Sequence, residues 1–259
     1  MKIDSISIIF PFYNEENRLT ECFKDIKNFN RNNNKINKEY IFVNDGSFDK
    51  SERLINNFIK KTKSNKTNYK IISLKKNSGK GFAIKKGILK AKGKWILTLD
   101  IDISVSLAQL NLWLKKGYIN NKNNIYFGSR NVKGSILNLK IYRRLFGFFF
   151  RILIKFILKI NLFDSQCGFK LYPKKIAKII FLNLKEKGFV HDLEIVLLSN
   201  NKKIIVKELP VIWNHKDNSK LNLFIDSAKM FFGMLRLRKY LKSWSKFPRY
   251  IINYIRKCK

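Results

Sequence analysis

Trp95-Ile-Leu-Thr-Leu-Asp100-Ile-Asp102-Ile-Ser104 is the stretch around which the rest of the chain is organised. Its mostly apolar start predicts a buried strand, and two carboxylates one residue apart follow at the end of that strand. Side chains two positions apart in an extended segment point to the same side, so Asp100 and Asp102 can converge on one cation. Hard divalent ions such as Mg²⁺ prefer carboxylate oxygens and commonly bridge to phosphates. A lone Asp-x-Asp is also typical of a plain polar strand end, so its surroundings must decide between the two interpretations.

Polar residues also stand at the ends of the preceding strands. Three further apolar runs that predict strands lie at residues 5–10, 40–43 and 69–74, each followed by a helical pattern. Pro11, Asp45 and the loop Asn77-Ser-Gly-Lys-Gly81 come directly after them. This alternation predicts an α/β fold with a mostly parallel, doubly wound sheet, in which ligands collect at the carboxyl ends of the strands. The glycine loop could hold a diphosphate with its amides and Lys80, although by itself it is more typical of an ordinary turn.

The pattern also predicts local features along the chain. We expect the first strand to end at Pro11, a helix to begin at Asn14, and Asp49 to cap the helix after the second strand. A polar loop is predicted over residues 28–38, helices over 107–114, 173–184 and 191–198, and a strand over 125–127. Residues 204–206 and 209–213 are predicted to pair as two strands separated by Lys207-Glu208.

Composition limits the class of protein. The 259 residues contain 54 Lys and Arg against 18 Asp and Glu, a net charge of +36, and 45% are hydrophobic. This hydrophobic content excludes a disordered polymer, and the charge favours a polyanionic partner, either nucleic acid or an anionic membrane face. The excess can also reflect the Lys, Asn, Ile and Phe that recur in every region. Three cysteines without metal-ligand spacing indicate a reducing compartment.

Residues 137–162 combine aromatic and aliphatic bulk with cations at helical spacing. The cations are Lys140, Arg143, Arg144, Arg151, Lys155 and Lys159. A basic amphipathic helix of this kind is typical of a membrane surface, and the alternative is a core helix that extends its lysines to solvent. The N-terminus lacks the pattern of a signal peptide, and no run of about 20 uncharged apolar residues predicts a spanning helix. Membrane contact is therefore expected at the interface.

Taken together and in order, the motifs resemble family 2 inverting glycosyltransferases with a GT-A fold. The first motifs are Phe10-Pro-Phe-Tyr-Asn-Glu15, Val43-Asn-Asp45-Gly-Ser-Phe-Asp49, Asn77-Ser-Gly-Lys-Gly81 and Asp100-Ile-Asp102. The later ones are Gly128-Ser-Arg130, Asp164-Ser-Gln-Cys-Gly-Phe-Lys170, His191-Asp-Leu-Glu194, Pro210-Val-Ile-Trp213 and Ser219-Lys220-Leu221, which resemble the branch that forms dolichyl-phosphate β-glucose. The resemblance covers about residues 5–230.

The resemblance implies a role for each matched residue. The nucleotide-sugar-binding set would be Pro11, Tyr13, Glu15, Asp45, Lys80, Asp100 and Asp102, with Asp45 on the base, Lys80 near the diphosphate and the last two on Mg²⁺ or Mn²⁺. The catalytic set would be Asp102, Arg130, Arg143, Arg144, Asp164 and Asp192. Arg130, with Arg143 or Arg144, would bind the acceptor phosphate, and the acidic residues would lie near the acceptor. A lipid phosphate is already anionic and needs no general base, so no acid is assigned that role.

The function expected on this basis is metal-dependent, inverting transfer of a hexose, glucose from UDP-glucose, to a polyprenyl or dolichyl phosphate. Alternatives are mannose from GDP-mannose, a saccharide acceptor, or, from a different class, a basic nucleic-acid-binding protein. We expect a peripheral enzyme on the cytoplasmic membrane face, with no nucleic-acid partner. Residues 1–220 would form the catalytic domain, with a membrane-interface insertion at 134–162, and residues 221–259 a basic amphipathic tail. Eukaryotic members of the branch carry an N-terminal anchor absent from this sequence, which favours a bacterial polyprenyl carrier.

Overall fold

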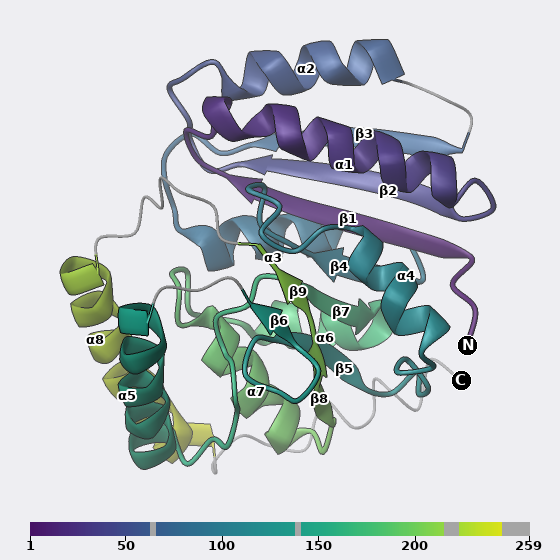
Figure 1. Cartoon of the computed structure of the whole chain (residues 1–259). Coiled ribbons are helices and arrows are strands. Elements are labelled where there is room, and N and C mark those ends of the chain that lie inside the picture. The colour runs from purple at the N-terminus through teal and green to yellow at the C-terminus, as the bar shows by residue number, and fades with distance from the viewer. Residues whose placement is uncertain (63–65, 138–140, 215–222, 245–259) are drawn as a thin grey trace.

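The computed structural model describes residues 1–62, 66–137, 141–214 and 223–244, without the side chains of 141–149, 223–226 and 241–244. In these residues one sheet has the strand order β3-β2-β1-β4-β7-β5-β8 (Figure 1). The strands are β1 (Ser5–Phe12), β2 (Asn37–Asn44), β3 (Thr67–Ser73), β4 (Trp95–Thr98), β5 (Ile125–Ser129), β7 (Lys170–Pro173) and β8 (Val206–Pro210). A second small sheet pairs β6 (Ile136–Leu137) with β9 (Ile212–Trp213). The α/β, mostly parallel fold class is confirmed.

Helices cover both faces of the main sheet. They are α1 (Leu19–Asn32), α2 (Ser51–Thr62), α3 (Lys80–Lys90), α4 (Ala108–Lys115), α5 (Ile141–Leu158), α6 (Lys174–Asn183), α7 (His191–Asn201) and α8 (Leu223–Trp244), with a 3-10 turn η1 (Glu16–Arg18). One core cluster joins the sheet to α1, α2 and α4, and the other joins it to α3, α5, α6, α7 and α8. Alternate residues of β1 divide between them, since Ile8 and Phe10 belong to the first cluster and Ile9 to the second.

β7 is the strand that departs from the parallel pattern. It lies between β4 and β5 and is antiparallel to both, with Lys170 opposite Thr98. From its sequence pattern alone, the segment 164–170 is expected to be a loop or a short strand. The insertion brings residues 164–170 beside the end of β4, where the carboxylate pair begins.

Several local predictions are wrong for identifiable reasons. β1 continues through Pro11 to Phe12, because its pairing with β4 ends at Ile9 and the missing proline amide interrupts no ladder there. Asn14 has a left-handed backbone (φ 54°) and precedes η1 instead of opening a helix. α1 continues to Asn32 through the predicted polar loop, since Phe29 is buried in the core.

The predicted hairpin at residues 204–213 is also wrong. β8 runs through Lys207 and Glu208 and pairs in parallel with β5, while β9 pairs with β6. The two segments therefore belong to different sheets. The prediction for Asp49 is confirmed, because its carboxylate accepts a hydrogen bond from the Ser51 amide at the start of α2.

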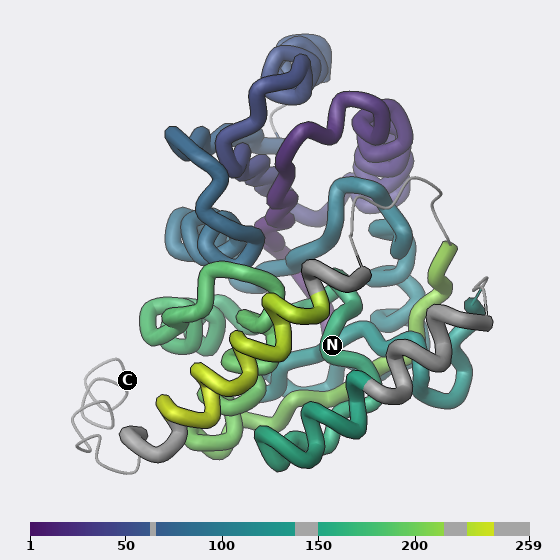
Figure 2. The backbone as a smooth tube through the Cα atoms, turned by 90° about the vertical axis from the view of Figure 1, so that its left-hand side faces the viewer, coloured from purple at the N-terminus to yellow at the C-terminus, as the bar shows by residue number. Residues whose placement is uncertain are grey.

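α5 and α8 lie side by side at one edge of the molecule (Figures 1 and 2). Each helix buries one side in the second core cluster, with Ile154, Ile157 and Leu158 from α5 and Met234 and Leu237 from α8. Each also exposes large apolar side chains, namely Ile152, Leu153, Phe156, Phe231, Phe232 and Leu235. The pair is thus both core and surface. None of the helices in the described ranges combines the length and apolarity needed to cross a bilayer.

Candidate active site

The loop after β4 carries the two predicted metal ligands. Asp102 Oδ1 accepts a hydrogen bond from the Ser104 backbone amide at 2.9 Å. Ile101 between the carboxylates is buried in the first core cluster, whereas the Asp100 side chain is 37% exposed. Burial and the neighbouring charge of Asp100 raise the pKa of Asp102. Two carboxylates that repel each other in a partly buried loop form a site that favours a cation.

Lys80 supplies a cation at this site in the structure. It is the first residue of α3, and its Nζ lies 2.5 Å from Asp100 Oδ1. Burial alone would lower the pKa of Lys80, but Asp100, Asp192 and Asp102 together raise it. The glycine loop therefore delivers a fully charged ammonium to the carboxylate pair, as a site for a diphosphate requires.

Asp45 joins the end of β2 to the glycine loop. Its Oδ1 accepts a hydrogen bond from the Ser78 amide at 2.7 Å, and its Oδ2 accepts one from the Gly79 amide at 2.8 Å. Gly79 has φ 101°, a conformation that glycine adopts without strain. Burial raises the pKa of Asp45, although both hydrogen bonds favour its charged form. The structure thus shows Asp45 orienting the loop before Lys80, and its contact with a base stays a prediction.

The end of β1 is tied to the same region through Asn14, for which no role in the site was predicted. Its amide donates to Ser47 Oγ at 2.9 Å, and its side-chain oxygen accepts from the Phe48 amide at 2.9 Å. The Glu15 amide donates to Ser51 Oγ, and the Tyr13 ring packs edge-on against Phe48. These contacts hold the predicted nucleotide-binding segment next to the loop after β2. The sequence signal for this turn was the asparagine itself, because asparagine adopts the left-handed backbone conformation more readily than most residues.

The absence of a side chain at Gly168 leaves space for the Asp100 carboxylate. A Cβ added to Gly168 would lie 2.4 Å from Asp100 Oδ2. The Gly168 carbonyl also accepts a hydrogen bond from Thr98 Oγ1 at 3.3 Å. The described residues contain no group of three or more His, Cys, Asp or Glu around a common point. The site nevertheless fits a divalent ion, since Mg²⁺ is often bound by one or two carboxylates together with substrate phosphates.

Gly168→Ala is therefore expected to displace the Asp100 carboxylate and weaken the metal site without unfolding the protein. We expect the apparent affinity for Mg²⁺ to fall roughly 10- to 100-fold, as when groups that orient metal ligands are altered. The measurement is Mg²⁺ titration of transfer activity, together with thermal unfolding. Gly188→Ala is the matched control, because a Cβ there meets nothing within 4 Å. An unchanged Mg²⁺ dependence in Gly168→Ala would show that Asp100 is not held in this way.

Arg130 and Asp164 form the predicted acceptor side. Arg130 Nε and Nη2 lie 2.6 and 2.9 Å from the two Asp164 oxygens, a bidentate pair. Asp164 is buried, and its amide donates to Glu208 at 2.7 Å. Burial opposes the charge of Arg130, but Asp164 raises its pKa, with smaller contributions from Cys167 and Asp100. The segment 164–170 joins the acceptor and donor sides, since its Asp164 holds Arg130 and its Gly168 lies against the Asp100 carboxylate. Glu208, read in the sequence only as a strand separator, supports it from β8.

The other residues predicted for the site have different surroundings. Asp192 is buried in the first turn of α7, with Oδ1 2.6 Å from Lys170 Nζ and 2.9 Å from His191 Nε2. Glu194 accepts the Lys185 and Glu186 amides and so holds the turn before α7. Pro11 lies within β1. Arg143 and Arg144 belong to α5, but their side chains are outside the described residues.

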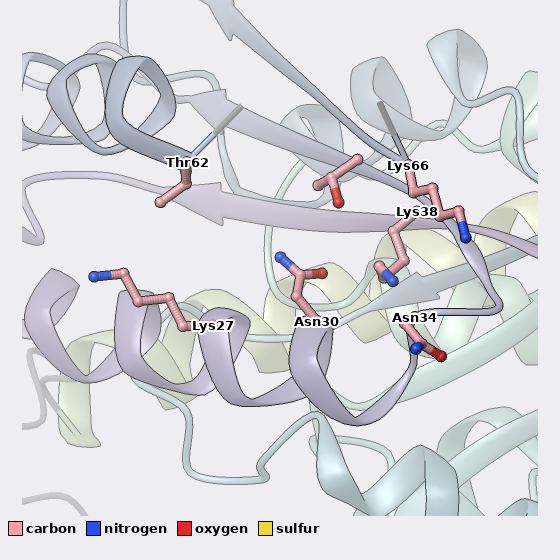
Figure 3. Close-up of a pocket in the computed structure, with 7 residues that line it drawn as sticks. Lys27, Asn30, Asn34, Lys38, Thr62 and Lys66 are labelled. Atoms are coloured by element: carbon pink, nitrogen blue, oxygen red, sulfur yellow. The ribbon is translucent and has the colours of Figure 1, made fainter. Parts of the chain in front are cut away.

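A cavity of about 490 Å³ lies away from this site (Figure 3). It is lined by Lys27, Asn30, Asn34, Lys38, Thr62, Lys66 and Thr67. These residues lie at or near the ends of α1 and α2 and the starts of β2 and β3. This is the side of the sheet where the parallel strands begin, opposite the carboxyl ends that carry the candidate site. The cavity therefore plays no part in the arrangement around Asp100.

Solved glycosyltransferase structures share this architecture. Glucosyl-3-phosphoglycerate synthase from Mycobacterium tuberculosis, in complex with Mg²⁺ and UDP, superposes with a TM-score of 0.60 at 13% identity over 91% of this chain and 79% of that one. Staphylococcus aureus TarS in complex with UDP-GlcNAc superposes with a TM-score of 0.57 at 17% identity over 90% of this chain and 65% of that one. The fold is of the GT-A type.

Sequence comparison identifies the family, within proteins of this fold, to which the chain belongs. The glycosyl transferase family 2 model matches residues 7–181. Dolichyl-phosphate beta-glucosyltransferase of Dictyostelium discoideum is 33% identical, covering 92% of this chain and 76% of its own. The human protein of that name is 31% identical, covering 92% and 77%. The chain belongs to glycosyl transferase family 2, whose GT-A members commonly use a divalent metal.

Proposed function

We propose that the protein transfers glucose from UDP-glucose to a polyprenyl phosphate of the dolichyl type, with inversion at the anomeric carbon. The observation that carries the proposal is that Asp100 contacts Lys80 and also lies against Gly168, in the segment whose Asp164 holds Arg130. The relatives named as dolichyl-phosphate beta-glucosyltransferases, which this chain matches over most of its length, support the choice of sugar and acceptor.

The nucleotide-sugar donor would bind at the carboxyl ends of β1, β2 and β4. Pro11, Tyr13 and Glu15 would contact the nucleoside, Asp45 would serve the base side, and Lys80 would turn from Asp100 to the diphosphate. Asp100 and Asp102 would hold Mg²⁺ or Mn²⁺. When bound, such an ion neutralises charge that builds on the departing nucleoside diphosphate.

The acceptor half would rely on arginine. A phosphate monoester is an anion at neutral pH, so the protein has to hold it in line with the anomeric carbon and need not remove a proton. Arg130, oriented by Asp164, would bind one phosphate edge, with Arg143 or Arg144 as the second cation. The ionised Asp164 is committed to Arg130, which argues against its acting as a base.

The test is a donor-by-acceptor assay with radiolabelled UDP-glucose and GDP-mannose against polyprenyl phosphate and soluble saccharides. The proposal predicts label from UDP-glucose in a solvent-extractable, mild-acid-labile lipid. Label from GDP-mannose alone would identify the alternative donor. Label confined to water-soluble glycan would reject the lipid acceptor.

The exposed side of α5 and α8 would hold the enzyme on the cytoplasmic face of a membrane. The six exposed apolar side chains lie among exposed Lys155, Lys159, Lys229, Arg238 and Lys239. Apolar bulk flanked by cations suits the interface of an anionic bilayer. We retain residues 1–220 as the catalytic domain, with 134–162 as its membrane-facing insertion and 221–259 as a basic tail.

The double variant Phe156→Ser/Phe232→Ser is expected to lose binding to anionic vesicles. Removing two phenylalanines from the interface forfeits about 1.5–3 kcal/mol each, so partitioning should fall by at least about 100-fold. Vesicle co-sedimentation measures this. The control is Ile205→Ser, a 57% exposed apolar side chain just before β8. Unchanged sedimentation of the double variant would mean that α5 and α8 do not provide the contact.

A further inference from the structure

A buried ion pair lies beneath the carboxylate loop. Lys170, the first residue of β7, has a side chain only 2% exposed, and its Nζ is 2.6 Å from Asp192 Oδ1. Asp192 is likewise buried. Taking two charges out of water is costly, and apolar replacements of such pairs are often as stable or more so. A contribution to the stability of the fold is therefore a poor explanation for the burial of this ion pair.

The pair connects two segments of the candidate site. Lys170 stands opposite Thr98 in the β4–β7 ladder. Asp100 follows Thr98 by two residues, and Gly168 precedes Lys170 by two residues. Asp192 follows His191, and a Cβ added to Gly81 would lie 2.6 Å from the His191 Cβ. Gly81 directly follows Lys80. The start of α7 is thus clamped to the sheet on one side and to the start of α3 on the other.

Within this arrangement Asp192 is ionised and its charge is compensated. Burial opposes the ionised form of Asp192, but His191 and Lys170 lower its pKa, so it is a carboxylate at neutral pH. A carboxylate already compensated by a buried ammonium is a poor proton acceptor. Asp192 instead acts as a fixed negative charge that, with Asp100 and Asp102, raises the pKa of Lys80.

We propose that Lys170 and Asp192 are positioning residues for Lys80. Lys170 anchors Asp192, and Asp192, with the His191–Gly81 contact, fixes the start of α3 so that the Lys80 ammonium stands at Asp100, where a donor diphosphate would lie. This inference rests on the proposed function, because Lys80 is its donor-binding cation. Neither Lys170 nor Asp192 would touch a substrate.

The test removes both charges together. Lys170→Met/Asp192→Leu is expected to unfold at the same temperature as the wild type or higher. Its kcat/KM for UDP-glucose should fall about 10- to 100-fold, as for other residues that orient a ligand-binding group, while KM for polyprenyl phosphate is unchanged. Lys170→Gln/Asp192→Asn provides a second, polar version if the apolar pair folds poorly. The control is Glu39→Gln/Lys70→Met, an ion pair 2.9 Å apart in which Glu39 is buried and Lys70 is 33% exposed, and its loss should leave donor kinetics unchanged.

A double-mutant cycle distinguishes positioning from general damage. If the pair acts through Lys80, the triple variant should lose no more kcat/KM than Lys80→Met alone, so that the pair substitutions have no further effect once Lys80 is gone. Calorimetric binding of UDP in the presence of Mg²⁺ should show the same non-additivity without turnover. Full additivity, or wild-type donor kinetics in the pair variant, would overturn the inference. Absence of lipid-linked transfer by the wild type, with the UDP-binding cycle intact, would reject only the proposed function.

Discussion

Asp102→Asn is expected to reduce glucosyl transfer by about 10³-fold, because it removes one of two carboxylates from a metal site whose ion contributes several kcal/mol. The fold should survive, since asparagine has nearly the same volume and its oxygen can still accept the Ser104 amide that Asp102 Oδ1 accepts now. Turnover at a series of Mg²⁺ concentrations, with thermal unfolding alongside, measures both expectations.

Asp4→Asn is the matched control for that experiment. It makes the same chemical change at a carboxylate just before β1 that is 60% exposed and 3.8 Å from Lys94 Nζ, an exposed ion pair that contributes little to stability. Both stability and transfer should stay near wild type. If Asp102→Asn retained near-wild-type turnover at saturating Mg²⁺, the assignment of the metal site would be wrong.

Arg130→Gln is expected to damage both catalysis and stability. Loss of charged hydrogen bonds to the acceptor phosphate, worth about 1.5–3 kcal/mol each, should lower kcat/KM for polyprenyl phosphate by at least roughly 10- to 100-fold. The substitution also strands Asp164, a buried carboxylate, which typically costs about 3–5 kcal/mol of the free energy of unfolding. Kinetics at fixed UDP-glucose and urea unfolding at pH 7 measure the two effects.

The stability defect should depend on pH in a defined direction. Arg130 lowers the pKa of Asp164 against the opposing effect of burial, so in the wild type the pair stabilises the fold above the unfolded pKa of about 3.9 and this stabilisation is lost as the pH falls through the folded value. In Arg130→Gln burial acts unopposed by Arg130, and the defect should shrink as acid protonates Asp164. Arg130→Gln/Asp164→Asn should recover stability at pH 7 but not transfer. A defect in Arg130→Gln that does not change with pH would contradict this origin.

Much of the fold follows from local pattern, because β1 to β4 and their helices are long periodic segments. The errors arise where long-range contacts decide. Phe29 extends α1 through polar residues because it reaches the core, and Glu208 stays within β8 because it caps the amides of Phe163 and Asp164. The antiparallel insertion of β7 depends on pairing with β4 and β5, which lie far from it in the sequence, and its four residues cannot encode that pairing locally.

The candidate site was predictable where a motif marks a strand end. Asp100 contacts Lys80 directly and is linked to Arg130 through the segment from Asp164 to Gly168, although the chemical roles of these residues stay predictions. Lys170 and Gly168 were part of a quoted motif without an assigned role. Their importance appears only once β7 lies beside β4, because it is then that Lys170 reaches Asp192 and Gly168 meets Asp100.

Inverting transfer of glucose to a lipid phosphate is measured most directly by NMR of the lipid product formed from UDP-glucose and polyprenyl phosphate with Mg²⁺. The expected product is a glucose joined through its anomeric carbon to phosphate in the β configuration, opposite to that of the donor. An α-linked product, or glucose recovered only in water-soluble form, would contradict it.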